Sequence, residues 1–153
     1  MKKQFLTAGL ALALCVGYSV SALAQAKPET LVKQRQAAMT LQGKYFYPRL
    51  RPMAQGKIPY DANAAARDAE MLAALSKMPW DGFAPSTKDL KTGALPAVYT
   101  DTAKFKESAD HLQTESAKLV VVIKSGDEAA VKAQILAVDK VCGSCHDSFR
   151  EKQ

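Results

Sequence analysis

Apolar residues recur at spacings of three and four over four stretches of this chain, which is the pattern of helices that bury one face. The expected helices run from about Pro28 to Tyr47, Asp61 to Met78, Asp101 to Lys124, and Asp127 through Phe149. Strand-like alternation does not compete with this pattern, and the links between the helices are short, long and short. The sequence therefore predicts an all-α fold, an antiparallel up-down four-helix bundle.

Each expected helix carries one stripe of residues that would form the core. The inward positions are Leu31, Ala38, Met39, Tyr45 and Phe46 in the first helix, Ala65, Ala69, Leu72 and Leu75 or Ala73 in the second, Phe105, Ala109, Leu112, Ser116, Leu119 and Ile123 in the third, and Val131, Ile135, Val138, Cys142, Cys145 and Phe149 in the fourth. The last stripe continues through two cysteines, so a group attached to them would be held in the core near the C-terminal helix.

Prolines and glycines mark the breaks in this pattern. Pro48 and Pro52 are expected to end the first helix, and residues 79–100 to form a long irregular connection. Connections of this length are uncommon in compact domains unless they cover something. The aromatic residues that could pin this one to the bundle are Trp80, Phe83 and Tyr99.

The most specific chemical signal is the sequence Val141-Cys142-Gly143-Ser144-Cys145-His146 near the C-terminus. Its C-x-x-C-H pattern is typical of c-type haem attachment. Cysteines three apart on a helix place both sulfurs on one face, where each can bond to a haem vinyl group. His146 follows on the same side and can bring its imidazole to the iron as an axial ligand. The pattern predicts one covalently bound haem c, attached through Cys142 and Cys145.

Other readings of the same residues are weaker. A redox thiol pair or a local disulfide needs no histidine here, and a thioredoxin-like site would need a βαβ context. A zinc site would need further ligands, yet His111 is the only other histidine and Cys15 the only other cysteine. Haem attachment is therefore favoured.

Residues 1–24 resemble a secretory signal peptide, with Lys2 and Lys3, an apolar run from Leu6 to Val20, and a small-residue cleavage site before Gln25. The alternative is an uncleaved anchor, but the apolar run is short for a membrane span. Cleavage would leave residues 25–153 as one domain that is not in the membrane. We expect export to the periplasm.

Cleavage would also change the charge and the cysteine count. Cys15 would be removed, so that both remaining cysteines belong to the haem motif, and the formal charge would fall from +6 to +4 because Lys2 and Lys3 leave. The lysines are spread along the chain without an aromatic-basic platform, so nucleic-acid binding is not supported. The charge indicates no more than a weak preference for acidic partners.

Polar residues interrupt the expected inward faces. Arg35 lies between Leu31 and Met39 at spacings of four, so it either pairs with a haem propionate, as Gln36 beside it could, or reaches solvent at the bundle edge. Arg150 is the i+4 neighbour of His146, so it either projects on the haem side or complements the end of the helix. Gln42 is interpreted as a bundle-edge residue, and His111 is expected to face solvent or a neighbouring carboxylate; neither is given a role.

An exported four-helix chain with one C-x-x-C-H motif near its C-terminus resembles the class II c-type cytochromes, most closely the cytochrome c′ family. The resemblance covers residues 27–153. Its more specific pieces are Arg35-Gln36-Ala37-Ala38-Met39-Thr40-Leu41, Gly56-Lys57-Ile58-Pro59-Tyr60-Asp61, Leu75-Ser76-Lys77-Met78-Pro79-Trp80 and Cys142-Gly143-Ser144-Cys145-His146-Asp147-Ser148-Phe149-Arg150.

The resemblance implies roles for several residues. His146 would be the only protein ligand of a five-coordinate, high-spin iron, and Met39 would cover the vacant distal face. Arg35 and Gln36 would lie near the haem propionates, and Arg150 near the proximal histidine. In a related low-spin branch, which resembles cytochrome c556, a methionine of the first helix is the sixth iron ligand. Members of the family also pair through their first two helices, so a homodimer is possible.

Three functions are compatible with these residues. The first is a periplasmic haem protein that binds nitric oxide and carbon monoxide and exchanges one electron with an unidentified redox partner. The second is a low-spin electron carrier with Met39 as sixth ligand. The third is a haem-free helical interaction module or thiol pair. Enzymatic turnover is not expected, because the sequence shows no acid–base pair or nucleophile beyond the haem site.

Overall fold

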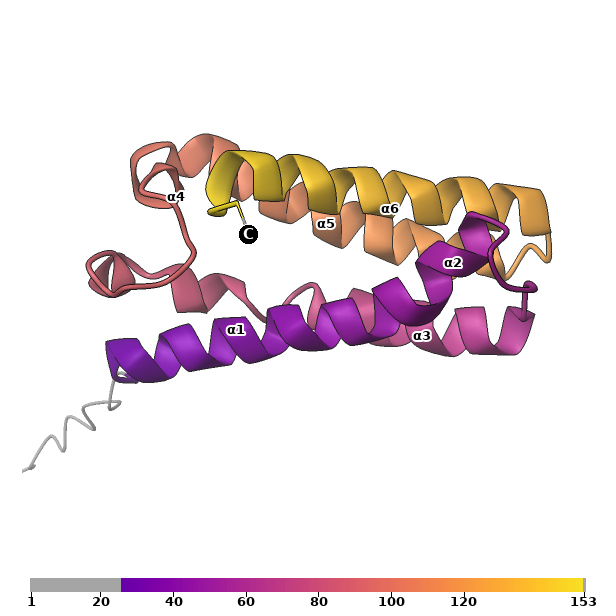
Figure 1. Cartoon of the computed structure of the whole chain (residues 1–153), viewed down its shortest axis with the longest axis horizontal. Coiled ribbons are helices and arrows are strands. Elements are labelled where there is room, and N and C mark those ends of the chain that lie inside the picture. The colour runs from indigo at the N-terminus through magenta and orange to yellow at the C-terminus, as the bar shows by residue number, and fades with distance from the viewer. Residues whose placement is uncertain (1–25, 153) are drawn as a thin grey trace, which may run out of the picture.

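The computed structural model describes residues 26–152, so the predicted signal peptide, residues 1–24, lies outside the described residues. The long helices are α1 (Pro28–Tyr45), α3 (Ala62–Leu75), α5 (Thr102–Ile123) and α6 (Glu128–Phe149). They run alternately up and down in two layers, with α1 beside α3 and α5 beside α6 (Figure 1). The predicted antiparallel four-helix bundle is confirmed. Within residues 26–152, no helix is long and apolar enough to cross a membrane.

The starts of the helices follow from local chemistry. Pro28 occupies the first turn of α1, where its missing N–H removes no helical hydrogen bond. Asp61 caps α3 by accepting a hydrogen bond from the amide of Ala64, as Asp127 caps α6 with the amides of Ala129 and Ala130. These caps satisfy amides that the first helical turn leaves without partners.

The expectation that Pro48 and Pro52 end the first helix was wrong. The chain continues helically through a π-helical turn, Phe46–Leu50, into the short helix α2 (Arg51–Ala54). The wider turn accommodates Pro48, which has no amide to donate, and Pro52 lies in the first turn of α2. The chain bends here and brings α2 across to α6 (Figure 1), where Arg51 pairs with Asp139 at 3.0 Å.

The core joins the helices around the first half of α6. Its buried residues are Phe46, Leu50, Met53, Ala64, Ala65, Ala69, Leu72, Leu112, Leu119, Val131, Ile135, Val138 and Val141. Alanines on α3 let the neighbouring helices approach closely, as Ala65 and Ala69 are fully buried. Asp68, also fully buried, accepts hydrogen bonds from Nε and Nη2 of Arg49 at 2.6 and 2.8 Å. This ion pair was not foreseen from the sequence.

Residues 79–100 form the expected long connection. It contains 3-10 turns at Trp80–Phe83 and Pro85–Thr87 and the short helix α4 (Ala97–Thr100). The predicted pinning by aromatic residues is confirmed: Trp80 and Phe83 pack on Phe105 of α5, and the Tyr99 hydroxyl contacts Arg35 of α1. The connection contacts α1 through Gly82 and the C-terminal end of α6 through Ala94.

Gly82 allows this connection to approach α1. A Cβ atom there would lie 2.4 Å from Cβ of Arg35 and 2.7 Å from the Leu31 carbonyl oxygen, whereas one at Gly93 would meet nothing within 4 Å. We therefore expect Gly82→Ala to lower the free energy of unfolding by about 1–3 kcal/mol. Gly93→Ala should change it by less than about 0.5 kcal/mol. Urea unfolding measures both, and equal effects of the two changes would contradict this packing.

The Arg49–Asp68 pair gives a second prediction. Asp68→Asn removes a buried charge from its partner and should destabilise the protein by about 2–3 kcal/mol, somewhat less than for a fully buried pair because Arg49 is half-exposed. The control Asp110→Asn breaks an exposed pair with Lys106 and should cost less than about 1 kcal/mol. If urea unfolding gives the two variants the same midpoint, the buried pair is not stabilising.

Candidate functional site

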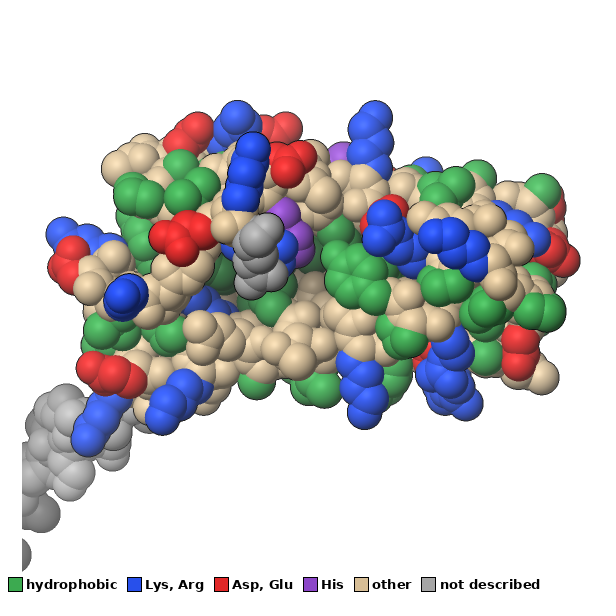
Figure 2. Space-filling model, viewed as in Figure 1, with side chains coloured by type: hydrophobic (Ala, Val, Ile, Leu, Met, Phe, Trp, Pro, Cys, Tyr) green, Lys and Arg blue, Asp and Glu red, His purple; other side chains and the backbone are tan. Residues whose placement is uncertain are grey.

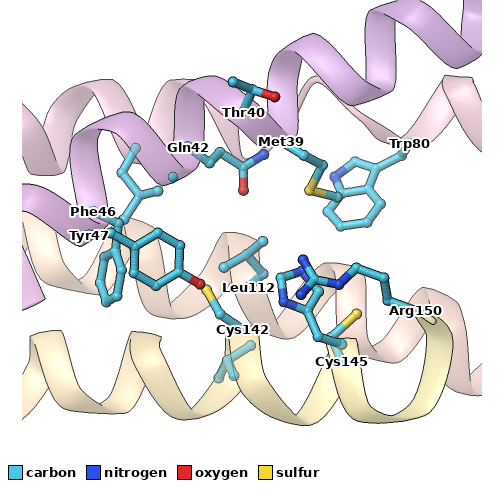
Figure 3. A pocket seen from close by; sticks show the side chains of 14 residues that line it. Met39, Thr40, Gln42, Phe46, Tyr47, Trp80, Leu112, Cys142, Cys145 and Arg150 are labelled. Atoms are coloured by element: carbon cyan, nitrogen blue, oxygen red, sulfur yellow. The ribbon is translucent and has the colours of Figure 1, made fainter. Parts of the chain in front are cut away.

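The C-x-x-C-H motif lies on the last two turns of α6, with both thiols free and half-buried. Cys142, Cys145 and His146 share one helical face, while Gly143 and Ser144 are exposed on the other. Figure 3 shows the two cysteine side chains pointing from α6 into a cavity whose opposite wall is α1. The predicted placement of both sulfurs on one side of the helix is therefore confirmed.

Two adjoining cavities, of about 300 and 400 Å³, occupy the space between α1 and α6. We call them together the α1–α6 cavity because they share Met39, Thr40, Trp80, Cys145, His146 and Arg150. One part extends to Phe46 and Tyr47, and the other to Arg35 and Phe149. Figure 2 shows the hollow between the two helical layers, with a histidine side chain at its edge. A volume of this size suits a small-molecule cofactor.

Burial sets the protonation of the motif. It raises the pKa of Cys142 to about 11, with further contributions from Asp139 and Cys145, and it also raises the pKa of Cys145. The pKa of His146 is lowered, first by burial and then by the positive charge of Arg150. At neutral pH the thiols are therefore protonated and the imidazole is neutral. A reactive thiol pair is disfavoured, and His146 keeps a nitrogen lone pair for a metal.

Arg35 is buried, with 3% of its surface exposed, so the alternative of an arginine reaching solvent at the bundle edge was wrong. Its Nη1 donates to the Gly82 carbonyl at 2.5 Å, to Thr87 Oγ1 at 3.1 Å and to the Tyr99 hydroxyl at 3.2 Å. Its Nη2 donates to Thr92 Oγ1 at 2.9 Å. These acceptors are neutral, and among residues 26–152 no carboxylate pairs with this cation.

Gln36 and Arg150 are exposed residues that also line the α1–α6 cavity. The backbone amide of Arg150 donates to the His146 carbonyl at 3.0 Å, which closes the last turn of α6. Its guanidinium extends back toward the cavity beneath Met39 and Trp80 (Figure 3). Arg150 therefore lies on the same side of α6 as His146, which is the first of the two alternatives that the sequence left open.

The α1 wall of the cavity presents Met39 among polar side chains. Met39 is half-buried and faces α6 (Figure 3). Two nearby donors are engaged by backbone carbonyls: Trp80 Nε1 donates to Ser76 at 2.7 Å, and Gln42 Nε2 to Leu75 at 3.1 Å. The interpretation of Gln42 as a bundle-edge residue was wrong, since only 6% of it is exposed. Gln42 lies three residues after Met39, and this spacing was the sequence signal that could have indicated its burial.

The residues of the cavity fit a haem better than the alternatives. Within residues 26–152, no group of three or more histidine, cysteine or acidic side chains could hold a metal ion. His111 is exposed and lies 3.9 Å from Glu115. A haem would place carboxylates near the unpaired Arg35 cation and would supply the metal that the neutral His146 can bind.

The comparisons with known proteins agree with this site. A cytochrome c′ from Rubrivivax gelatinosus is 42% identical over 127 residues, which cover 82% of this chain and 98% of that protein. A cytochrome c′ structure from Shewanella frigidimarina is 32% identical with a TM-score of 0.79, over 84% of this chain and 99% of that one. A variant from Alcaligenes xylosoxidans, solved as a nitric oxide complex, is 36% identical with a TM-score of 0.76, over 84% and 99%.

The family model of cytochrome c′ matches residues 30–150, which contain the C-x-x-C-H motif and all of the four long helices except the first two residues of α1. The predicted family resemblance is thereby confirmed. This chain belongs to the cytochrome c′ family, whose members bind covalent haem c.

Proposed function

We propose that this protein is a periplasmic haem protein that binds nitric oxide and carbon monoxide and exchanges single electrons. Cys142 and Cys145 would hold the haem, and His146 would be its only protein ligand. The observation that carries the proposal is one cavity with this motif on its α6 wall and the apolar Met39 on its α1 wall. When bound, the haem would supply an iron that can take a diatomic ligand and exchange single electrons.

The surrounding side chains would orient the group and select its ligands. Arg35 offers a buried positive charge to the propionates, and Gln36 offers a hydrogen bond from the exposed edge of the cavity. Near Met39, the N–H of Trp80 is already bonded to a backbone carbonyl, as is Gln42 Nε2. Neutral diatomic molecules that need no hydrogen-bond donor are therefore favoured over oxygen, which gains most from one. Arg150 would lie beside ligands on the His146 side.

The Alcaligenes xylosoxidans complex with nitric oxide supports the choice of ligand. Export through the signal at residues 1–24 would bring the chain to the periplasm, as the sequence predicts. A role in scavenging nitric oxide, without enzymatic turnover, would follow from such binding. The second candidate is a low-spin electron carrier, because Met39 and His146 line the same cavity from opposite sides. Two axial ligands would limit rearrangement between oxidation states.

One spectrum separates these two candidates. We expect the purified, exported protein to retain its haem through acid–acetone extraction, to show a high-spin ferric spectrum, and to bind nitric oxide and carbon monoxide when reduced. Met39→Ala should leave the spectrum high-spin and raise carbon monoxide affinity about tenfold, since roughly 1–2 kcal/mol of steric cost is removed. The control Leu41→Ala alters an exposed side chain of the same helix and should change neither property.

A low-spin spectrum that becomes high-spin only in Met39→Ala would establish the second candidate instead. A protein without covalent haem would contradict both. His146→Ala should alter the spectrum in either case, because the imidazole is the proposed ligand in both.

We further propose a homodimer formed through the first two long helices. Both expose large apolar side chains, with Leu41 of α1 40% exposed and Met71 of α3 39% exposed. Leu41→Lys would place a charge in such an interface and should weaken dimerisation at least tenfold. Sedimentation velocity would measure this, with Val121→Lys on α5 as the control. A monomeric parent protein would rule out the proposal.

A further inference from the structure

The connection at residues 79–100 touches the helices on both sides of the α1–α6 cavity. One end of it packs on α1 and the other pairs with the C-terminal end of α6. Trp80, Phe83 and Thr92 to Ala94 belong to both the connection and the cavity wall. The connection therefore lies where it can fix the distance between the two walls.

Arg35 provides the attachment on the α1 side. Its hydrogen bonds reach Gly82, Thr87, Tyr99 and Thr92, which span most of the connection. Thr87 is itself 1% exposed and its hydroxyl lies 2.9 Å from that of Tyr99. One buried cation thus gathers distant parts of the connection into a single cluster, and hydrogen bonds to a charged donor are the stronger kind.

The attachment on the α6 side directly follows the haem motif. The amide of Leu95 donates to the Phe149 carbonyl at 3.0 Å, and the amide of Glu151 donates to the Gly93 carbonyl at 2.9 Å. These bonds form an antiparallel bridge between Ala94 and Arg150. Phe149 lies three residues after His146, so the connection holds the helical turn that carries the histidine.

A second route joins the same two ends through aromatic packing. The Arg35 guanidinium lies over the ring of Phe83, 4.4 Å from its centroid. Phe83 packs on Phe105 at a centroid distance of 4.9 Å, and Phe105 packs on Phe149 at 5.2 Å. Both ring pairs have edge-to-face geometry, which is favourable for aromatic contacts. Arg35 therefore reaches Phe149 through side chains as well as through the backbone of the connection.

We propose that Arg35 is a positioning residue for His146: through the connection at 79–100 it holds the last turn of α6, and so sets how the imidazole is presented in the cavity. This inference rests on the proposed role of His146 as iron ligand. This positioning role differs from a contact with a haem propionate, because it requires the hydrogen-bond acceptors in the connection as well as the charge of Arg35.

The test compares the reduced holoprotein with its Arg35→Lys variant, which keeps the charge but loses the planar set of donors. Loss of charged hydrogen bonds should speed hydrogen exchange at the amides of Leu95 and Glu151 about ten- to a hundredfold. Resonance Raman spectroscopy should show the iron–His146 stretching band shifted or broadened. Asp68→Asn, which weakens the bundle without touching the connection, should leave that band unchanged.

A second variant separates positioning from the charge and from folding. Tyr99→Phe combined with Thr92→Val retains Arg35 and removes two of its acceptors. This double variant should shift the iron–His146 stretching band in the same direction as Arg35→Lys, by a smaller amount. If Arg35→Lys does not fold, the double variant alone tests the positioning role of Arg35. An unchanged band in this double variant would overturn the proposal.

Two further outcomes have definite meanings. If Arg35→Lys speeds exchange at Ile135 in the far core as much as at Leu95, Arg35 supports the whole bundle and the proposal fails. If the parent protein holds no covalent haem, or if its spectrum is unchanged in His146→Ala, the proposed ligation fails and His146 has no iron to be positioned for. The exchange rates at Leu95 and Glu151 would still show whether Arg35 holds the connection.

Discussion

The structure depends on the burial of one cation, the guanidinium of Arg35, at the side of the bundle. Such a charge is costly unless it is surrounded by acceptors. The connection at 79–100 supplies them from Gly82, Thr87, Thr92 and Tyr99. This segment lies against α1 and also forms part of the wall of the cavity between α1 and α6. The buried charge therefore lies beside the cavity and is joined to its wall.

The two ends of the bundle are consequently packed in different ways. Around Val131 and Ile135 the helices pack directly on one another, and both side chains are fully buried. Cys145 and His146 instead line the cavity, and both side chains are only half-buried. A haem at this end would complete the core that the polypeptide leaves open. Its removal should therefore affect this end of the bundle more than the other.

Much of the fold could be predicted because periodicity and capping are local properties. Two expected helices start at Asp61 and Asp127, which cap α3 and α6, and the stripe that carries Cys142 and Cys145 lies on one continuous helix. The chain stays helical past Pro48 because a π-helical turn accommodates a proline, which has no amide N–H to donate. The residue type alone does not show that such a turn will form. The partners of Arg35 and Asp68 could not be predicted either. They lie in segments that only tertiary packing brings together.

The character of the cavity follows from the same tertiary hydrogen bonds. From their positions in the sequence alone, Trp80 and Gln42 would be expected to offer free N–H donors beside Met39. Instead, Trp80 bonds to the carbonyl of Ser76 and Gln42 to that of Leu75, where α3 ends and leaves carbonyls without helical partners. The end of one helix thereby engages two donors on the wall opposite His146. The selection of neutral ligands proposed for this protein therefore depends on the hydrogen bonds of these side chains and not only on their type.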